Sequence, residues 1–376
     1  MGNLRERLSA VAYEQGFVLV GFASLRALER GPFLQRWLED GRHGEMGYLA
    51  REPQRRLDPR LLDPHLRSVI SLAYPYRAPR PPRVNWRQEL RGRIAAYALG
   101  DDYHGYVLTK AQRVGAALDT LRPRALARTY VDTGPVLERE WALAAGLGWV
   151  GKNTNLLTRR FGSYFFLAEI FTDVDFGAES PAYGAHCGRC RRCLELCPTG
   201  ALEDGLVIDA RLCISYLTIE LRGAIPLPLR PRIGNWVFGC DICQEVCPWN
   251  DEPKGDSDGR LAPYLPELLA LDQDQFNRRF ARSAIKRAKR RGLLRNAAVA
   301  LGNSANPRAV PVLVECLERE PEALVRAHAA WALGRLGGSA GRRALEGRLS
   351  SEPDPAVGQE ITLALALSGA PASESV

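Results

Sequence analysis

Two cysteine runs decide the fold of this chain: Cys187-Gly-Arg-Cys190-Arg-Arg-Cys193-Leu-Glu-Leu-Cys197-Pro198 and Cys240-Asp-Ile-Cys243-Gln-Glu-Val-Cys247-Pro248. The first run has the spacing C-x2-C-x2-C-x3-C-P, and the second repeats it with one cysteine fewer. A [4Fe-4S] cubane needs four thiolates, and in this pattern the last cysteine of a run binds the cluster of the other run. The spacing therefore predicts a bacterial-type ferredoxin module with two [4Fe-4S] clusters.

The eight predicted ligands come from the two runs and from one cysteine between them. Cys213 is the unassigned cysteine nearest to the runs, and it completes the second set. The resulting sets are Cys187, Cys190, Cys193 and Cys247 for the first cluster, and Cys197, Cys213, Cys240 and Cys243 for the second. Cys316 lies on an apolar helical stripe and is predicted to be a packed core residue.

Paired cysteines can also build tetrahedral zinc sites or disulfides. The triple spacing and the proline after each run favour iron–sulfur clusters over zinc. Disulfides are disfavoured because nothing in the sequence marks secretion.

Composition indicates a globular protein of two or three domains. The chain has 376 residues, of which 46% are hydrophobic and 25% charged. The charged N-terminus lacks an export signal, and apolar stretches such as residues 141–150 are too short to cross a bilayer, so we expect a cytoplasmic protein.

The periodicity of the sequence predicts four segments. Residues 1–180 alternate helical patterns with β-rich runs, near residues 17–22, 68–74 and 164–171, and are expected to form an α/β domain. Residues 181–252 contain the cluster module, and residues 253–274 are a predicted connecting segment. In residues 275–376, Ala298-Val-Ala-Leu-Gly302 recurs as Ala330-Trp-Ala-Leu-Gly334, with a weaker copy at 363–369, which predicts all-α HEAT-like repeats.

The start of the repeat segment is strongly basic. The formal net charge of the chain is +8, and residues 275–376 hold 16 Lys and Arg against 9 Asp and Glu. Arg282, Lys286 and Lys289 have the spacing of one helical face, so a positive stripe could follow a phosphate backbone. The candidate RNA contacts are Arg282, Lys286, Arg287, Lys289, Arg290, Arg291 and Arg295.

Three further features bear on chemistry. Gly146-Leu-Gly-Trp-Val-Gly151 matches G-x-G-x-x-G, but it follows a helical run rather than a strand, which argues against a dinucleotide site. Asp132 lies where a short β-like segment meets a turn, and the sequence leaves open whether it stabilises the turn or acts as a catalytic acid. His104 and His186 are interpreted as surface or packing residues.

Several strings together resemble one family. They are Val131-Asp-Thr-Gly-Pro-Val-Leu-Glu-Arg139, Gly148-Trp-Val-Gly-Lys-Asn-Thr-Asn-Leu156, Ser215-Tyr-Leu-Thr-Ile-Glu220 and Asn235-Trp-Val-Phe-Gly, followed by the second cysteine run. With the first run and the basic helical tail, they resemble the epoxyqueuosine reductases of queuosine biosynthesis. The resemblance implies a nitroreductase-like α/β domain that binds base-off cobalamin, and electrons relayed singly through the two clusters.

The implied reaction converts epoxyqueuosine at the wobble position of a tRNA with a GUN anticodon into queuosine. The resemblance assigns the proton donor to Asp132, which would require a buried or otherwise charge-disfavouring site. It also implies an external electron donor such as flavodoxin or ferredoxin, and we expect a monomer. The implied cobalamin contacts are Arg56, Arg139, Lys152, Asn153 and Ser215.

Two other functions compete with this interpretation. A reductive dehalogenase-like enzyme would pair a corrinoid with two clusters but act on a small molecule; the basic repeats argue against it. A non-catalytic RNA-binding iron–sulfur protein would leave the Asp-Thr-Gly-Pro and Gly-Lys-Asn-Thr-Asn strings unexplained. Some relatives place a cysteine where this chain has Leu99, so that segment supplies no thiolate ligand to cobalt here.

Overall fold

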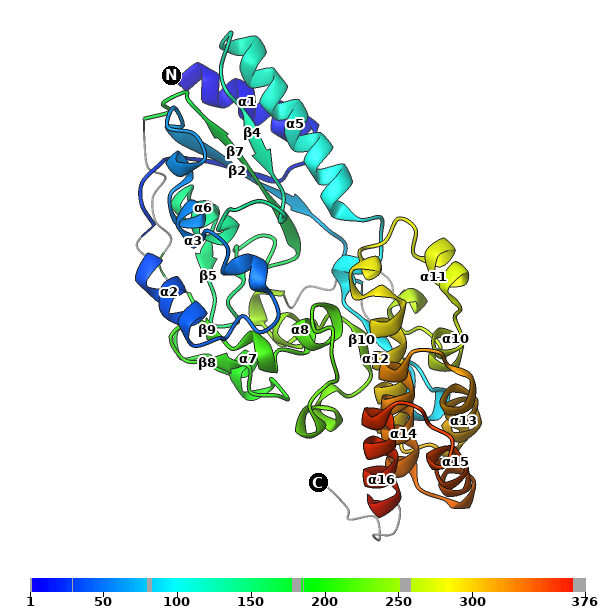
Figure 1. Cartoon of the computed structure of the whole chain (residues 1–376). Coiled ribbons are helices and arrows are strands. Elements are labelled where there is room, and N and C mark those ends of the chain that lie inside the picture. The colour runs from blue at the N-terminus through cyan, green and yellow to red at the C-terminus, as the bar shows by residue number, and fades with distance from the viewer. Residues whose placement is uncertain are drawn as a thin grey trace. The chain divides into compact units, whose positions relative to one another are not determined.

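A computed structural model describes residues 2–28, 30–79, 83–177, 184, 186–250 and 258–367 (Figure 1). The chain divides into two compact units. The first, here the sheet unit, takes residues 1–78, 102–211 and 242–254. The second, here the repeat unit, takes residues 79–101, 212–241 and 255–376. Each unit is therefore assembled from segments that are far apart in sequence.

A four-stranded antiparallel sheet forms the centre of the sheet unit. Its order is β1 (Leu19–Ser24), β2 (Ser68–Pro75), β7 (Phe165–Thr172) and β4 (Arg128–Tyr130). The two central strands are apolar along most of their length because both faces of the sheet are covered. The β-rich runs predicted near residues 17–22, 68–74 and 164–171 are confirmed as β1, β2 and β7.

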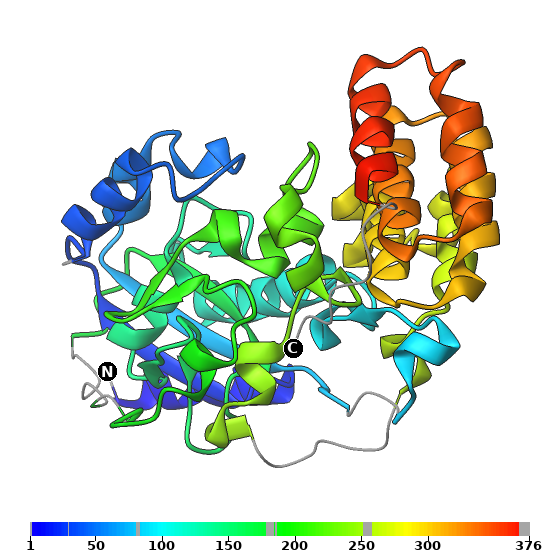
Figure 2. The same ribbon diagram turned by 90° about the horizontal axis from the view of Figure 1, so that it is seen from below.

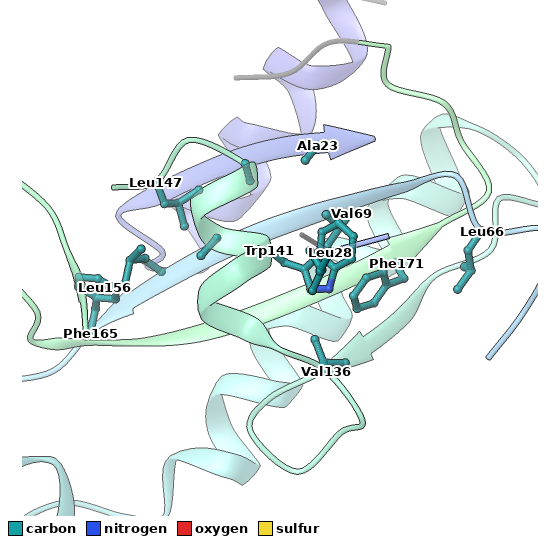
Figure 3. Close-up of a cluster of buried hydrophobic side chains, with 13 residues drawn as sticks. Ala23, Leu28, Leu66, Val69, Val136, Trp141, Leu147, Leu156, Phe165 and Phe171 are labelled. Carbon is teal, nitrogen blue, oxygen red and sulfur yellow. The ribbon is translucent and has the colours of Figure 1, made fainter. Parts of the chain in front are cut away.

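Helices pack on both faces of this sheet. α1 (Gly2–Glu14) and α5 (Tyr103–Leu121) pack together, and α5 contacts β4 and β7. α6 (Glu138–Ala144) covers the other face, where Trp141 packs edge-on against Phe171 with ring centroids 5.8 Å apart (Figure 3). Residues of β7 that share the side of Phe171 therefore face α6, since side chains alternate along a strand.

The cluster segments of the sheet unit are short and rich in turns. α7 (Arg192–Glu195) packs against α9 (Ile242–Glu245), so the two cysteine runs lie next to each other. A hairpin of β5 (Trp149–Val150) and β6 (Leu156–Leu157) joins α6 to β7. The other elements are α2 (Gly31–Glu39), α3 (Pro53–Leu57), β8 (Leu202–Glu203), β9 (Val207–Ile208) and the 3-10 turns Gly47–Leu49, Pro59–Leu61 and Pro248–Asn250.

The repeat unit is a stack of helices (orange to red in Figure 2). α12 (Lys289–Asn303), α14 (Ala323–Leu336) and α16 (Pro355–Leu367) pack in succession, and α13 (Val310–Arg319) and α15 (Ser339–Leu349) pack beside them. Before them come α4 (Trp86–Glu89), β3 (Arg93–Ile94), α8 (Ile214–Ile219), β10 (Trp236–Phe238), α10 (Leu265–Leu269) and α11 (Gln273–Arg279). β3 and β10 pair in parallel.

The glycine that ends each copy of the repeated string has a packing role. A Cβ added at Gly302 would lie 2.9 Å from the Cα of Ala332, and one added at Gly334 would lie 2.7 Å from the Cα of Ala364. Successive helices thus touch backbone to backbone, which explains why the string recurs. The last two residues of the weaker third copy fall outside the described residues.

In the part of the chain that the structure describes, no helix has both the length and the apolar character needed to span a membrane.

Candidate active site

Asp132 follows β4 in a turn with left-handed backbone geometry at that residue (φ 56°). Its Oδ2 atom accepts hydrogen bonds from the Tyr103 hydroxyl at 3.0 Å and from His104 Nε2 at 2.9 Å. Its backbone N–H donates to the carboxylate of Glu138. The side chain is 57% exposed, so burial is not what provides the charge-disfavouring site that the role of proton donor was expected to require.

His104 links Asp132 to a second carboxylate. Its Nδ1 lies 2.6 Å from Asp102 Oδ1, and Asp102 also caps the start of α5. Desolvation lowers the pKa of His104, but the hydrogen bonds to Asp132 and Asp102 outweigh it and raise that pKa above its ordinary value. The ring is therefore biased towards the imidazolium form, which donates from both nitrogens.

Two acids stand behind the turn. Glu138 is the first residue of α6, and Glu169 lies on β7, fully buried. Burial, followed by the negative charge of Asp132, raises the pKa of Glu138 to about 7. Burial and the charge of Glu138 raise the pKa of Glu169 well above its ordinary value. Neither acid could be recognised from the sequence, and His104 was expected to have only a surface or packing role, because the contacts join α5, β7 and α6 across the sheet.

The predicted cobalamin contacts occupy different places. Arg56 donates to the carbonyl oxygens of Gly134 and Tyr48, both at 3.1 Å, and so holds the Asp132 turn. Arg139 is exposed and donates to the carbonyl of Thr154, while desolvation by surrounding protein lowers its pKa. Because Arg139 is exposed, an anionic or amide group of a ligand could reach its guanidinium.

The other three predicted contacts lie elsewhere. Lys152 donates to the carbonyls of Gly188 and Cys190 at 2.9 and 3.0 Å, and so supports the first cysteine run. Asn153 is buried and donates to the carbonyl of Cys243 at 3.3 Å. Ser215 lies on α8 in the repeat unit. The donors of Lys152 and Asn153 therefore support the cluster segments.

The first predicted set of cluster ligands lines one cavity of about 240 Å³ in the sheet unit. Desolvation, and then the charges of Cys247, Cys187 and Cys190, raise the pKa of Cys193 to about 11. Four thiolates held in one cavity would repel each other, and binding to iron would remove this repulsion. The cavity therefore fits a [4Fe-4S] cluster. Lys152, His186, Arg192 and Trp249 also line it.

The second predicted set is divided between the units. Cys197 and Cys243 belong to the sheet unit, and Cys213 and Cys240 to the repeat unit. Cys213 precedes the first turn of α8, and Cys240 lies two residues after β10. Cys316 is buried on α13, and burial raises the pKa of its thiol to about 12, which confirms that it is a packed core residue.

The basic segment differs from the predicted helical stripe. Arg282 lies in the turn after α11, Lys286 in the 3-10 helix Ala284–Ala288, and Lys289 at a left-handed kink (φ 59°) that starts α12. The single helical face expected for these three residues is therefore wrong, because the chain changes direction between them. All three side chains are nevertheless exposed, as are Arg287 and Arg291.

Two basic residues of this segment point inwards. Arg295 is fully buried and donates to the carbonyls of Leu217, Leu221 and Gly223, at and beyond the C-terminal end of α8. Arg290 forms a two-bond ion pair with Glu320, at 2.8 and 2.6 Å. The prediction that Arg290 and Arg295 contact RNA is corrected accordingly, since internal partners occupy both guanidinium groups.

Some of the exposed cations also have partners. Arg282 pairs with Asp101, and Arg287 forms a two-bond ion pair with Glu220 at 2.9 and 3.1 Å. Lys289 and Arg291 have no ion pair among the described residues. These two, with Lys286, are the side chains most readily available to a phosphate.

Comparison with known proteins agrees with this architecture. Residues 56–133 match the family model "Epoxyqueuosine reductase QueG, DUF1730", residues 186–250 match "4Fe-4S double cluster binding domain", and residues 279–366 match "HEAT repeats". The predicted ferredoxin module and helical repeats are thereby confirmed.

Curated relatives match over most of their length. Epoxyqueuosine reductase from Pseudomonas aeruginosa is 43% identical over 337 residues, covering 86% of this chain and 92% of that protein. The Escherichia coli enzyme is 37% identical over 346 residues, covering 89% and 90%.

Solved structures give the same result. Epoxyqueuosine reductase with an epoxyqueuosine-modified tRNA-Tyr stem loop superimposes with a TM-score of 0.89 at 31% identity, covering 98% of this chain and 99% of that chain. A Bacillus subtilis epoxyqueuosine reductase, with its catalytic aspartate loop swung out of the active site, has a TM-score of 0.88 at 30% identity, covering 97% and 99%. This chain therefore belongs to the epoxyqueuosine reductase family, a family of oxidoreductases.

Proposed function

We propose that this protein reduces epoxyqueuosine at the wobble position of tRNA to queuosine. One observation carries the proposal: three hydrogen bonds between segments that adjoin in sequence connect the turn of an exposed acid to the cavity lined by the first set of cysteines. Asp132 bonds to Glu138, the neighbouring Arg139 bonds to Thr154, and Lys152 bonds to Cys190. Family membership and the near-complete match to a relative that binds an epoxyqueuosine-modified stem loop support the substrate.

Asp132 is the proposed proton donor. Removing an epoxide oxygen as water consumes two electrons and two protons, so an acid must stand where the oxygen leaves. The Asp132 carboxyl is exposed enough to meet a substrate, and the Tyr103 hydroxyl and the His104 ring fix its orientation. His104 is biased towards its imidazolium form and lies against Asp132, so a proton is at hand as the carboxyl gives one to the departing oxygen.

Cobalamin is the proposed reducing cofactor, and it would supply a strongly reducing nucleophile to the epoxide. Arg139 fits as a contact for a corrinoid phosphate or amide because its guanidinium is a charged donor that is accessible from solvent. Arg56 fits indirectly by holding the Asp132 turn through Gly134. Lys152 and Asn153 join the cofactor region to the cysteine runs, and Ser215 is a further proposed contact.

Two [4Fe-4S] clusters are proposed to deliver single electrons. Cys187, Cys190, Cys193 and Cys247 would hold the first, in the cavity described above. Cys197, Cys213, Cys240 and Cys243 would hold the second. An external protein such as flavodoxin or ferredoxin is the proposed electron donor. The enzyme is proposed to be a monomer in the cytoplasm.

The proposed RNA surface is the exposed basic segment at the start of the repeats. Lys286, Lys289 and Arg291 would contact phosphates directly, and Arg282 and Arg287 could do so by exchanging their present carboxylate partners. Phosphate contacts of this kind set affinity and register, while recognition of the modified base belongs to the active site.

Replacement of the proposed acid tests the assignment. Asp132→Asn keeps a side chain of the same shape but cannot donate a carboxyl proton. We expect it to bind clusters and cobalamin at wild-type levels and to lose about 10²- to 10⁴-fold in turnover, the range of general acid catalysis. Asp119→Asn, at an exposed acid on α5, is the matched control and should turn over normally. Normal turnover by Asp132→Asn would remove Asp132 from the mechanism.

A further inference from the structure

The two cysteine runs carry charges of opposite sign. Between its first and last cysteines, the first run holds three arginines and one glutamate. The second run holds Asp241 and Glu245 in the same region, with no lysine or arginine. Cluster binding uses only the cysteines, so it does not by itself explain this difference. Positive charge therefore gathers on the run that supplies most of the first proposed cluster site.

The three arginines of the first run differ in their partners. Arg191 donates to both carboxylate oxygens of Asp204, at 3.0 and 2.8 Å. Arg189 and Arg192 are exposed, and neither forms an ion pair with any residue that the structure describes. Their guanidinium groups are thus open to carboxylates of another molecule, which arginine binds through two parallel hydrogen bonds.

Arg189 and Arg192 both adjoin the proposed ligands of the first cluster. Arg189 lies in the turn from Cys187 to Cys190, where Lys152 holds two backbone carbonyls at 2.9 and 3.0 Å. Arg192 lines the same cavity as these cysteines. An electron that arrives at either arginine therefore has only a short path to a ligand sulfur.

An exposed apolar side chain accompanies the two arginines. Leu196 ends α7, and it is 52% exposed. Its backbone N–H donates to the carbonyl of Arg192 at 3.0 Å, so the two residues are one helical turn apart and share one face. Protein interfaces combine an apolar centre with charged contacts that steer the partner. The surface formed by Arg189, Arg192 and Leu196, here the donor surface, has this composition and lies within the sheet unit.

We propose that the donor surface docks a small acidic protein that carries single electrons, and that electrons enter the enzyme through the first cluster. Each docking event would oxidise the carrier by one electron and reduce the four-cysteine site by one, with no bond made or broken. The inference rests on the proposed function, which requires an external electron donor. A phosphate backbone offers no apolar partner to Leu196, so a protein fits this surface better than RNA does.

Charge reversal at the donor surface tests the proposal. Reduced flavodoxin, an acidic one-electron carrier, is mixed anaerobically with reconstituted protein in the absence of tRNA, and cluster absorbance is followed by stopped flow. In Arg189→Glu combined with Arg192→Glu, we expect the second-order rate constant to fall at least about tenfold at low ionic strength. The difference from wild type should shrink as salt screens the charges. The affinity for oxidised flavodoxin, measured by titration calorimetry, should fall in parallel.

Two control variants separate docking from net charge and from side-chain identity. Arg342→Glu combined with Arg343→Glu on α15 changes the net charge equally and should react with flavodoxin like the wild type. Arg189→Lys combined with Arg192→Lys keeps the charge and should retain most of the rate. If charge reversal prevents cluster assembly, Arg189→Gln combined with Arg192→Gln takes its place, with a smaller expected loss.

An uncharged small reductant separates docking from effects on the cluster. Photoreduced deazariboflavin needs no docking surface, so it should reduce the charge-reversed variant as fast as the wild type. Equal losses of rate with deazariboflavin and flavodoxin would overturn the proposal, as would an unchanged flavodoxin rate. Lower tRNA affinity with an unchanged flavodoxin rate would assign the surface to RNA instead. Turnover driven by deazariboflavin does not depend on this surface, so it tests the proposed function separately.

Discussion

Glu352 should contribute strongly to the stability of the last repeat. It lies just before α16 with a fully buried side chain, and it accepts from Arg326 at 2.9 and 2.6 Å and from Arg348 at 2.8 Å. Desolvation raises its pKa, but the hydrogen bonds from the two arginines outweigh this and lower the pKa from 4.5 to about 2. This lowering of the Glu352 pKa corresponds to a contribution of about 3 kcal/mol to the free energy of unfolding at neutral pH.

Glu352→Gln should therefore lower the free energy of unfolding by about 3 kcal/mol, because it also leaves the buried Arg326 without its countercharge. The assay is urea unfolding followed by far-ultraviolet circular dichroism under anaerobic conditions. Glu346→Gln on α15 is the matched control: its pair with Arg342 is half exposed, and its loss should cost less than about 0.5 kcal/mol.

The pH dependence of this contribution has a fixed sign. A carboxyl group whose pKa is lowered by folding stabilises the folded state above its unfolded pKa, and the stabilisation disappears as pH falls through its folded pKa. The difference in the free energy of unfolding between wild type and Glu352→Gln should thus shrink as the pH falls from about 5 to about 2. Equal stabilities of Glu352→Gln and Glu346→Gln at neutral pH would refute the reasoning.

Two further predictions concern the RNA surface and the second cluster. Lys286→Glu combined with Lys289→Glu should weaken tRNA binding and reduce the slope of log K against log salt by about one to two. Arg342→Glu on α15 is the control and should have little effect on either quantity. Unchanged affinity of the double variant at physiological salt would argue against this surface. Cys213→Ser should lower the iron content of reconstituted protein from about eight atoms per chain towards four, and retention of eight would show that another ligand completes the second cluster.

The features that could be predicted from the sequence are those encoded locally. The spacing of the cysteine runs is a local property, and the family comparisons confirm the module it predicts. The string ending in Gly302 and Gly334 predicted repeats, because close helix contact requires a residue without a side chain at that point of each copy. The strands β2 and β7 were visible as apolar runs because both faces of the sheet are covered.

The errors and omissions involve residues whose surroundings come from distant parts of the chain. Arg295 resembled an RNA contact, but its partners are carbonyl groups more than seventy residues earlier in the chain. Lys289 was assigned to a continuous helix, but a left-handed residue there separates the 3-10 helix from α12. Glu169 was read as part of an apolar strand, and only the sheet register places it beside Ser71.

The central claim is that the protein removes the epoxide oxygen of epoxyqueuosine in tRNA. The most direct measurement starts from protein reconstituted with both clusters and cobalamin. It is incubated anaerobically with a strong reductant and tRNA carrying epoxyqueuosine, and the nucleosides are then identified by mass spectrometry. We predict loss of one oxygen and the appearance of queuosine. Unchanged epoxyqueuosine, with the clusters intact and the corrinoid bound, would contradict the claim and point to another corrinoid-dependent reduction.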